Sequence, residues 1–186
     1  MSFSDNDEQA LIRESVRRVC ADFPDEYWER HDSEAKFPQR FFDVMAASGW
    51  LGIAMPEEYG GSGKGIAEAA ILLEEVASSG AAMNGATPLH LSIFGMHPVV
   101  KHGSASMRKK FLPSVATGEL QVAFGVTEPD AGSDTTAIST FAKREGENYI
   151  VRGRKIWTTK AIESERVLLL VRTTPRSEVE RKTDGY

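Results

Sequence analysis

The sequence of 186 residues contains a single cysteine, Cys20, and no long apolar run. One cysteine cannot form an internal disulfide, and Cys20 falls in the apolar series of a predicted helix, so we expect a buried thiol. No segment reaches the ~18 apolar residues that a membrane-spanning helix needs. The N-terminus is acidic and has no apolar stretch, so no signal peptide is visible. These absences predict a cytoplasmic protein that does not bind membranes.

Basic patches and metal-binding motifs are missing as well. The net charge of -5 argues against a nucleic-acid partner, because phosphate binding needs a clustered basic face. The four histidines show no pair at helical ligand spacing, and one cysteine cannot complete a thiolate site, so we expect no metal. The glycine-rich run 60–65 departs from a P-loop at two of its fixed positions and is interpreted as a flexible turn.

Hydrophobic spacing divides the chain near residue 118. Before this point the spacing is helical, with Ser4 as the predicted N-cap of a first helix and Asp7 as its capping-box partner. Further helices are predicted from about 38 to 49, 66 to 79, 89 to 101 and 107 to 115. Strands are predicted at 121–126, 139–144, 148–152, 154–159 and 167–172, with a hairpin turn at 145–147. Helices followed by strands indicate an α+β fold, with a helical domain at 1–118 and a β domain at 119–186.

Two segments of the β domain carry the candidate chemistry. Residues 124–134 read Phe-Gly-Val-Thr-Glu-Pro-Asp-Ala-Gly-Ser-Asp, a strand that opens into a turn. Gly132 allows close backbone approach, and the turn can present N–H groups and the Ser133 hydroxyl to an anion. Taken alone, such a run is more often a surface turn, since turns select Pro, Asp, Gly and Ser.

The second segment, residues 155–160, reads Lys-Ile-Trp-Thr-Thr-Lys. Trp157 offers an aromatic face for a ring system. On a strand, alternation places Thr159, and not Thr158, on the same side as the Trp157 ring. A lone Trp on a strand is more often a core residue. The joint occurrence of both segments favours a site for a flat, polar-edged cofactor that carries phosphate.

Both segments resemble the flavin-binding signatures of the acyl-CoA dehydrogenases, and the resemblance extends from the first helix to the end of the chain. It implies an N-terminal all-helical domain, followed by an incomplete antiparallel β-barrel-like domain that binds FAD. The C-terminal helical domain of that family is expected to be absent from these 186 residues. The cofactor-binding residues that the resemblance implies are Phe124, Val126, Thr127, Gly132, Ser133, Trp157, Thr158 and Thr159.

The resemblance also implies individual roles. Thr127 is expected to bond the pyrimidine edge of the flavin, Trp157 to pack on its ring, and Thr159 to bond near N5. Ser133, beside Gly132, is expected to meet the FAD pyrophosphate and to lie close to the acyl-CoA substrate. Lys160 and Thr158 depart from the residues most common in the family, which bears on fine specificity and not on the cofactor.

The implied reaction is the FAD-dependent α,β-dehydrogenation of an acyl-CoA thioester in fatty acid metabolism, with electrons passed to an electron-transfer flavoprotein. Its base is usually a Glu of the C-terminal helical domain, so no catalytic residue is assigned. Three alternatives stay open: a shortened dehydrogenase, a subunit completed by another chain in an oligomer, and a non-catalytic assembly or binding subunit of a flavoprotein complex. Residues that set the acyl group are not identified, and the loose candidates Met83, Pro88, Leu89 and Ile93 serve equally well as helix packing.

Overall fold

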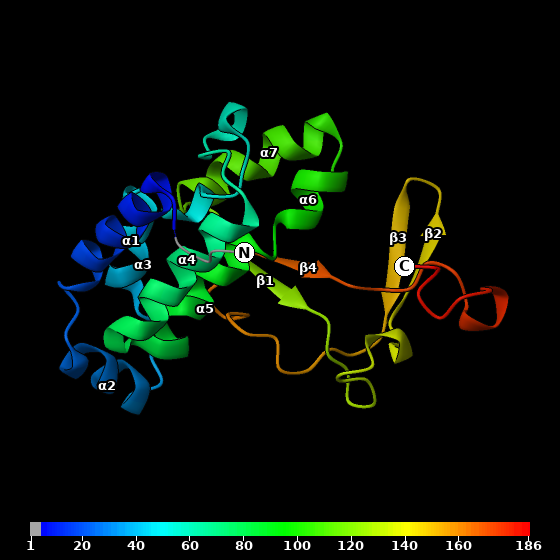
Figure 1. Cartoon of the computed structure of the whole chain (residues 1–186). Helices are drawn as coiled ribbons and strands as arrows, with labels where there is room; N and C mark the ends of the chain where they lie inside the picture. The colour runs from blue at the N-terminus through cyan, green and yellow to red at the C-terminus, as the bar shows by residue number, and fades with distance from the viewer. Residues whose placement is uncertain (1–4) are drawn as a thin grey trace. The chain divides into compact units, whose positions relative to one another are not determined.

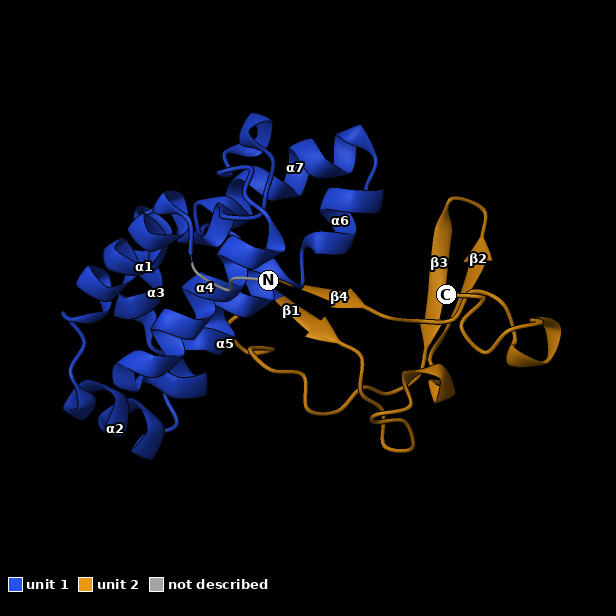
Figure 2. Cartoon of the chain, in the orientation of Figure 1, with its two compact units in different colours: residues 1–122 blue, residues 123–186 orange. Residues whose placement is uncertain are grey.

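The computed structural model describes residues 5–186 (Figure 1). The chain forms two compact units, residues 1–122 and residues 123–186, shown in different colours in Figure 2. We call them the helical unit and the β unit. The division falls a few residues after the predicted domain boundary at 118.

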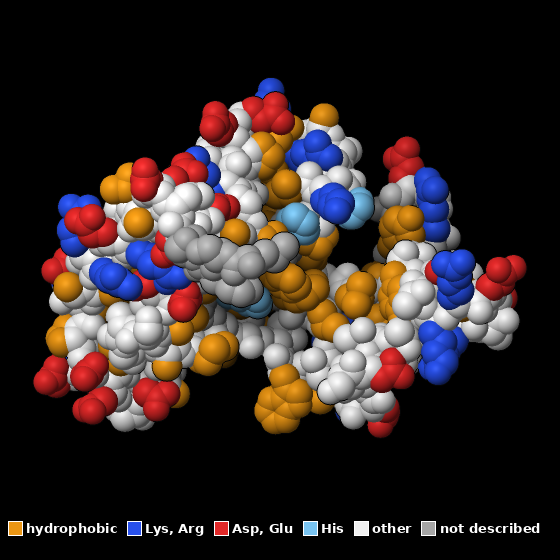
Figure 3. Space-filling model, viewed as in Figure 1, with side chains coloured by type: hydrophobic (Ala, Val, Ile, Leu, Met, Phe, Trp, Pro, Cys, Tyr) orange, Lys and Arg blue, Asp and Glu red, His pale blue; other side chains and the backbone are white. Residues whose placement is uncertain are grey.

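The helical unit contains seven α-helices within its described residues. They are α1 (Asp7–Cys20), α2 (Asp25–Ser33), α3 (Gln39–Ala47), α4 (Ile66–Val76), α5 (Ala82–Ile93), α6 (His97–His102) and α7 (Ala105–Ala116). None of the helices in the described part of the chain combines the length and the apolar character that crossing a bilayer requires. Acidic and basic side chains are interspersed over the face of this unit that Figure 3 shows.

Helix α1 begins at a different cap from the one predicted. Ser4 lies outside the described residues, and Asp7 is the first helical residue and not a capping-box partner. The cap is Asn6, whose side chain accepts from Gln9 N–H at 2.8 Å while the Gln9 side chain accepts from Asn6 N–H at 3.2 Å. This exchange satisfies two N–H groups that a helix start leaves unpaired. The apolar stripe of the helix is buried as predicted, and Cys20 is 3% exposed.

A cluster of aromatic rings forms part of the core between α1, α2 and α3. Phe23, Trp28 and Phe41 pack with ring centroids 4.9 to 6.2 Å apart. Trp28 Nε1–H also donates to the carbonyl of Phe23 at 3.0 Å, which satisfies its one polar group. Helix α2 was not predicted, because most of its nine residues are polar and only Tyr27 and Trp28 are buried.

Helices α1 and α4 are joined by charged side chains. The carboxylate of Glu75 is 6% exposed and accepts from Arg13 at 2.7 Å and from Arg17 at 2.6 and 2.9 Å. Burial alone would raise the pKa of Glu75, but the hydrogen bonds from Arg17 and Arg13 outweigh it and lower the pKa. The neighbouring Glu74 also accepts from Arg13, at 2.8 Å, but is 64% exposed.

The connection between α4 and α5 differs from the prediction. The helix predicted over 66–79 ends as α4 at Val76 and continues as a π-helical turn, Ala77–Ala81, in which Gly80 has φ +96°. Helix α5 then begins at Ala82, earlier than the predicted start at 89. Pro98, which falls inside the helix predicted over 89–101, lies in the first turn of α6, where a helix tolerates proline.

The glycine-rich run 60–65 is a turn, as predicted, and it packs against the preceding short helical turns. Ser62 N–H donates to the carbonyl of Gly52 and Gly63 N–H to that of Met55, at 3.0 and 2.8 Å. A Cβ atom at Gly61 would lie 2.1 Å from the Met55 oxygen, so this close approach requires glycine.

The β unit contains two two-stranded sheets and no closed barrel among its described residues. Its strands are β1 (Val122–Gly125), which begins at the last residue of the helical unit, β2 (Phe141–Glu145), β3 (Asn148–Arg152) and β4 (Arg166–Leu169), with β1 paired to β4. Strands β2 and β3 lie side by side as an antiparallel hairpin in register from Phe141 with Arg152 to Glu145 with Asn148 (Figure 1). The predicted turn is present, and Gly146 takes the positive φ, +65°, that such two-residue turns need.

Two strand predictions need correction. No strand forms at 154–159, where the backbone is irregular and enters a turn at Thr159. The strand predicted over 167–172 is β4, which ends at Leu169. Arg172 lies beyond it and forms an isolated bridge with Phe141.

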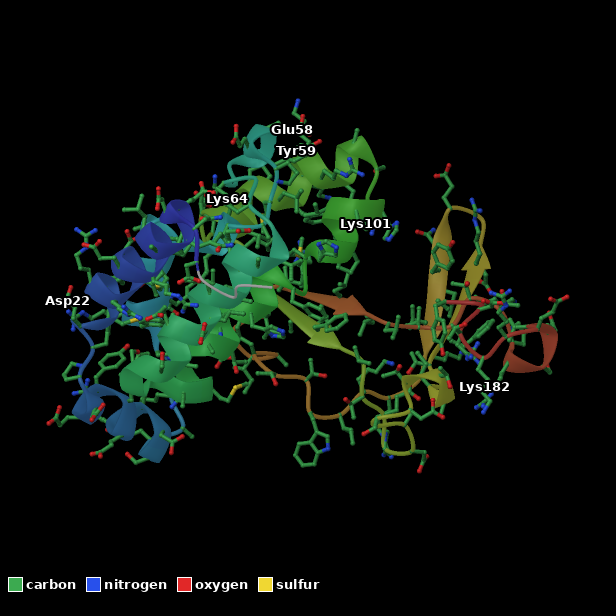
Figure 4. All side chains as sticks on the ribbon, viewed as in Figure 1. Asp22, Glu58, Tyr59, Lys64, Lys101 and Lys182 are labelled. Atoms are coloured by element: carbon green, nitrogen blue, oxygen red, sulfur yellow. The ribbon has the colours of Figure 1, made fainter. Side chains whose placement is uncertain are left out.

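Arg172 holds the last described residues of the β unit. Its guanidinium is buried and donates to the carbonyls of Lys182 and Asp184, both at 3.1 Å. It also lies 4.6 Å from the ring centre of Tyr186. The Lys182 side chain itself points outward (Figure 4). The N–H groups of Thr173 and Thr174 also donate to the carbonyl of Gly185, at 2.7 and 3.2 Å, so residues 182–186 are held without regular secondary structure.

Candidate functional site

The two candidate segments meet within the β unit. Ile156 N–H donates to the carbonyl of Thr127 at 2.9 Å, and Lys155 Nζ donates to the carbonyl of Val126 at 2.9 Å. Lys155 and Val126 are 29 residues apart in the sequence. The structure thus brings together the segments that the sequence singled out, although not through the predicted strand.

The first segment leaves β1 and closes a tight turn. Glu128 and Ala131 exchange backbone hydrogen bonds of 3.0 and 3.2 Å around the two residues between them. Gly132 and Ser133 follow on the surface, and no atom lies within 4 Å of the position a Gly132 Cβ would take. The turn is therefore open to close approach from outside.

Asp134 ends this turn. Its carboxylate accepts from Thr136 N–H at 3.1 Å and from the Thr136 hydroxyl. These bonds, the hydroxyl's first, lower the pKa of Asp134, so the carboxylate stays ionised while it caps the short 3-10 helix Thr135–Ala137. An anion is therefore expected to approach the Gly132 and Ser133 side of the turn and not the Asp134 carboxylate.

Trp157 is the most unusual residue of the second segment. Its side chain is 84% exposed, and its backbone has φ +56°. A large residue in the left-handed region is uncommon and costs free energy, so its occurrence suggests a functional constraint. The alternation used to choose between Thr158 and Thr159 does not apply here, because the segment is not a strand. Thr159 is exposed and Thr158 is half-buried.

The other candidate residues line the same region of the β unit. Phe124 lies in β1, and Val126 and Thr127 follow it directly; all three are half-buried. Among the candidate residues, the hydroxyls of Thr127, Ser133, Thr158 and Thr159 make no hydrogen bond within residues 5–186. These groups remain available to bond a ligand.

Sequence reasoning missed Glu128 and Lys155, which fix the site from inside. The Glu128 carboxylate is 4% exposed and accepts from Lys155 Nζ at 2.9 Å. It also accepts from Ser139 and Thr140 at 2.7 to 2.9 Å. Burial would raise the pKa of Glu128, but the bonds from Thr140, Lys155 and Ser139 hold it far below its usual range. Neither residue has a clear signal in the sequence, because Glu128 and Lys155 both stand among polar and charged neighbours.

Lys160 closes the second segment in a buried position. It is 7% exposed, and its backbone also has a positive φ, +62°. Burial lowers the pKa of Lys160 to about 8, against a smaller opposite effect of Glu163 and Glu165. Lys160, which departs from the residue most common in the family, is therefore part of the interior of the β unit.

Candidates in the helical unit are less suited to a ligand. Leu89 and Ile93 are 0% and 7% exposed and belong to the core, so they act as helix packing, whereas Met83 is 70% exposed. A pocket of about 360 Å³ lies at the end of α1, but its charged residues Arg17 and Glu75 are bonded to each other. No group of three or more metal-ligating side chains occurs within residues 5–186.

Comparison with known families gives the same division of the chain. The acyl-CoA dehydrogenase N-terminal domain matches residues 6–119, and the acyl-CoA dehydrogenase middle domain matches residues 123–185. The chain belongs to the acyl-CoA dehydrogenase family. The resemblance noted in the sequence is confirmed.

Curated proteins align with nearly all of this member of the acyl-CoA dehydrogenase family. Acyl-CoA dehydrogenase FadE12 of Mycobacterium tuberculosis is 31% identical over 178 residues, which is 92% of this chain and 44% of the relative. Glutaryl-CoA dehydrogenase of Desulfococcus multivorans is 31% identical over 182 residues, 96% of this chain and 45% of the relative. The chain thus spans less than half the length of these relatives.

Solved structures agree with the fold. A glutaryl-coenzyme A dehydrogenase in complex with glutaryl-CoA superimposes with a TM-score of 0.84 at 29% identity, covering 94% of this chain and 45% of that one. The FAD complex of PigA gives 0.86 at 27% identity, with 94% and 46% covered. The expected helical domain followed by a partial β region is confirmed.

Proposed function

We propose that this chain supplies the helical and flavin-binding portions of an FAD-dependent acyl-CoA dehydrogenase. The reaction is the α,β-dehydrogenation of an acyl-CoA thioester, and its electrons pass to an electron-transfer flavoprotein. The observation that carries the proposal is the convergence of residues 126–128 with residues 155–156 beside the exposed Trp157.

The residues present fit FAD. The exposed indole of Trp157 offers a face to a flat ring, and the hydroxyls of Thr127 and Thr159 can bond its polar edge. The open turn at Gly132 and Ser133 can receive a phosphate through its N–H groups and the Ser133 hydroxyl. The PigA structure in complex with FAD has the same fold, which supports this assignment.

In this proposal the chain's own residues bind and orient the cofactor. Trp157 packs on the ring, Thr127 and Thr159 fix its edge, and Ser133 holds the pyrophosphate near the acyl-CoA. Bound FAD supplies the acceptor for the hydride that leaves the β carbon of the substrate. Orientation of this kind lowers the barrier because the reactants are already aligned.

No base is assigned among the 27 Asp and Glu residues. The two buried carboxylates, Glu75 and Glu128, are paired with arginine and lysine and have lowered pKa values, so they are poor proton acceptors. The base is proposed to come from sequence beyond these 186 residues or from a complementing chain.

The proposed partners are the acyl-CoA, an electron-transfer flavoprotein and further subunits in a cytoplasmic oligomer. Two further solved structures share this fold. One comes from work on the electron transferring flavoprotein of Acidaminococcus fermentans, at 28% identity, and the other is the ChsE4-ChsE5 complex from Mycobacterium tuberculosis, at 29% identity. Both support a flavoprotein assembly.

The intact mass and chain composition of the protein purified from its natural source distinguish the open alternatives. A longer chain indicates that residues 1–186 are part of a complete dehydrogenase, and a second chain indicates a complementing subunit. FAD titration of the purified protein, followed by flavin fluorescence polarisation, tests the cofactor. A natural assembly that binds no FAD would overturn the proposal and favour the non-catalytic assembly or binding subunit.

A further inference from the structure

A buried ion pair joins the two candidate segments. Lys155 Nζ lies 2.9 Å from Glu128 Oε1, and the side chains are 9% and 4% exposed. The same ammonium donates to the carbonyl of Val126 at 2.9 Å. One cation therefore contacts the residues on both sides of Thr127, the candidate flavin-edge residue.

The Glu128 carboxylate is fixed in orientation by its other partners. Oε2 accepts from the N–H and from the hydroxyl of Ser139, both at 2.7 Å. Oε1 accepts from Thr140 N–H at 2.9 Å in addition to Lys155. Each oxygen thus has two donors, and the side chain cannot rotate without breaking several bonds at once.

The attachment continues from Lys155 to Trp157. Ile156 N–H donates to the carbonyl of Thr127 at 2.9 Å, so residues 155–156 are bound to residues 126–128 by side chain and by backbone. Trp157 follows immediately, with its ring 84% exposed. Because the indole packs so little on its own unit, its position depends on the residues that precede it.

A buried ion pair is a poor device for stability alone. Removing two charges from water offsets most of their attraction, and apolar side chains of similar volume stabilise a fold as well or better. Charge-assisted hydrogen bonds do provide what apolar contacts lack, namely a defined direction and length. Such directional support is what a ligand site requires of the residues behind it.

We propose that Glu128 and Lys155 are positioning residues that set Thr127 and Trp157 relative to each other for binding the flavin ring. The inference rests on the proposed function, since it takes FAD as the ligand. It adds two residues that do not touch the flavin and act through those that do.

The test uses the whole chain with Lys155→Met, Lys155→Arg and the double variant Glu128→Gln/Lys155→Met. The matched control is Lys143→Met, which breaks the exposed pair of Lys143 and Glu145 in the same unit. FAD affinity is measured by fluorescence polarisation, the bound flavin by its visible circular dichroism, and folding by urea denaturation of each apo-protein.

We expect Lys155→Met to weaken FAD binding about 10- to 100-fold, the equivalent of one charge-assisted hydrogen bond. The double variant, which leaves no buried charge unpaired, should regain stability but not affinity, and its flavin dichroism should differ from that of the wild type. Lys155→Arg keeps a charged donor and should retain more affinity than Lys155→Met. Lys143→Met should bind FAD as the wild type does.

Two results separate the possible failures. If the wild-type chain and the natural assembly bind no FAD, the proposed function fails. If the wild type binds FAD and the stable double variant binds it with the same affinity and dichroism, the ion pair only stabilises the fold and the positioning role is overturned. Should Lys155→Met fail to fold, the double variant and Lys155→Arg decide the question in the same way.

Discussion

Replacing Trp157 with alanine should separate ligand binding from stability. The side chain is 84% exposed, so its removal leaves no cavity and exposes little that was covered. Surface substitutions of this kind change the free energy of unfolding by less than about 0.5 kcal/mol. Alanine at φ +56° has the same backbone strain as tryptophan, whereas glycine does not. Trp157→Gly should therefore be more stable than Trp157→Ala by about 1 kcal/mol.

The effect of Trp157→Ala on FAD affinity should be much larger than its effect on stability. An aromatic side chain that stacks on a base or similar ring contributes about 1–3 kcal/mol, so Trp157→Ala should weaken FAD binding about 5- to 150-fold. Trp157→Phe keeps a smaller aromatic face and should lose less. The ratio of affinities, and not the absolute value, is the quantity compared, because the chain spans less than half of its relatives.

The assay is a fluorescence-polarisation titration of FAD, paired with urea denaturation. Trp28→Ala is the matched control, because this tryptophan is 4% exposed in the aromatic core. Its removal should cost about 3–5 kcal/mol of stability and leave FAD affinity unchanged under conditions where the chain is folded. Equal FAD affinity of Trp157→Ala and wild type, or a loss of stability like that of Trp28→Ala, would refute the assignment.

Four further outcomes are expected. Glu75→Gln should destabilise the helical unit by about 1.5–3 kcal/mol in urea denaturation, whereas Glu74→Gln, on an exposed carboxylate, should cost less than about 1 kcal/mol; similar losses would mean that burial does not govern this cluster. The pKa values of Glu75 and Glu128 are lowered on folding. The stability of the protein should therefore be constant above pH 4.5, the pKa of these groups in the unfolded chain, and should fall as the pH drops below it. A melting temperature that does not change with acid pH would contradict this. In the natural assembly, Thr159→Val should slow flavin reduction in stopped-flow experiments through loss of one positioned hydrogen bond, and unchanged kinetics would place Thr159 away from N5. The chain of residues 1–186 alone should not reduce a dye acceptor with FAD and acyl-CoA, and turnover by material of verified mass would show that it contains the base.

Long periodic patterns were readable from the sequence. The stripe of Ile12, Val16 and Cys20 repeats with helical spacing over about two turns, and these residues are buried in α1 as expected. The β2–β3 hairpin was also correct, because the alternating strands flank a two-residue turn with Gly146 at the position that needs positive φ. In α1 local preference and burial favour the same structure, whereas the mostly exposed hairpin depends on the preference of its turn.

Short or tertiary features were not readable. Helix α2 is held by two buried aromatic residues in an otherwise polar sequence, so its stripe is too short to detect. The segment 154–159 has the residues of a strand, but its hydrogen bonds go to Val126, Thr127 and Glu128 rather than to a regular partner strand. Trp157 then turns into the left-handed region, which no propensity scale favours for tryptophan. Tertiary contacts overrode the local preference here.

The same conflict between local preference and structure identifies the site. Natural sequences agree with their folds at most positions, and exceptions concentrate where function requires them. Trp157 combines an unfavourable backbone conformation with a ring that is 84% exposed, and neither property stabilises residues 123–186. Its two preceding residues are at the same time anchored by a buried ion pair and a backbone hydrogen bond. A segment that is firmly held, yet presents a large aromatic face outward, gains free energy only when another molecule covers that face, and a flat flavin ring meets this requirement.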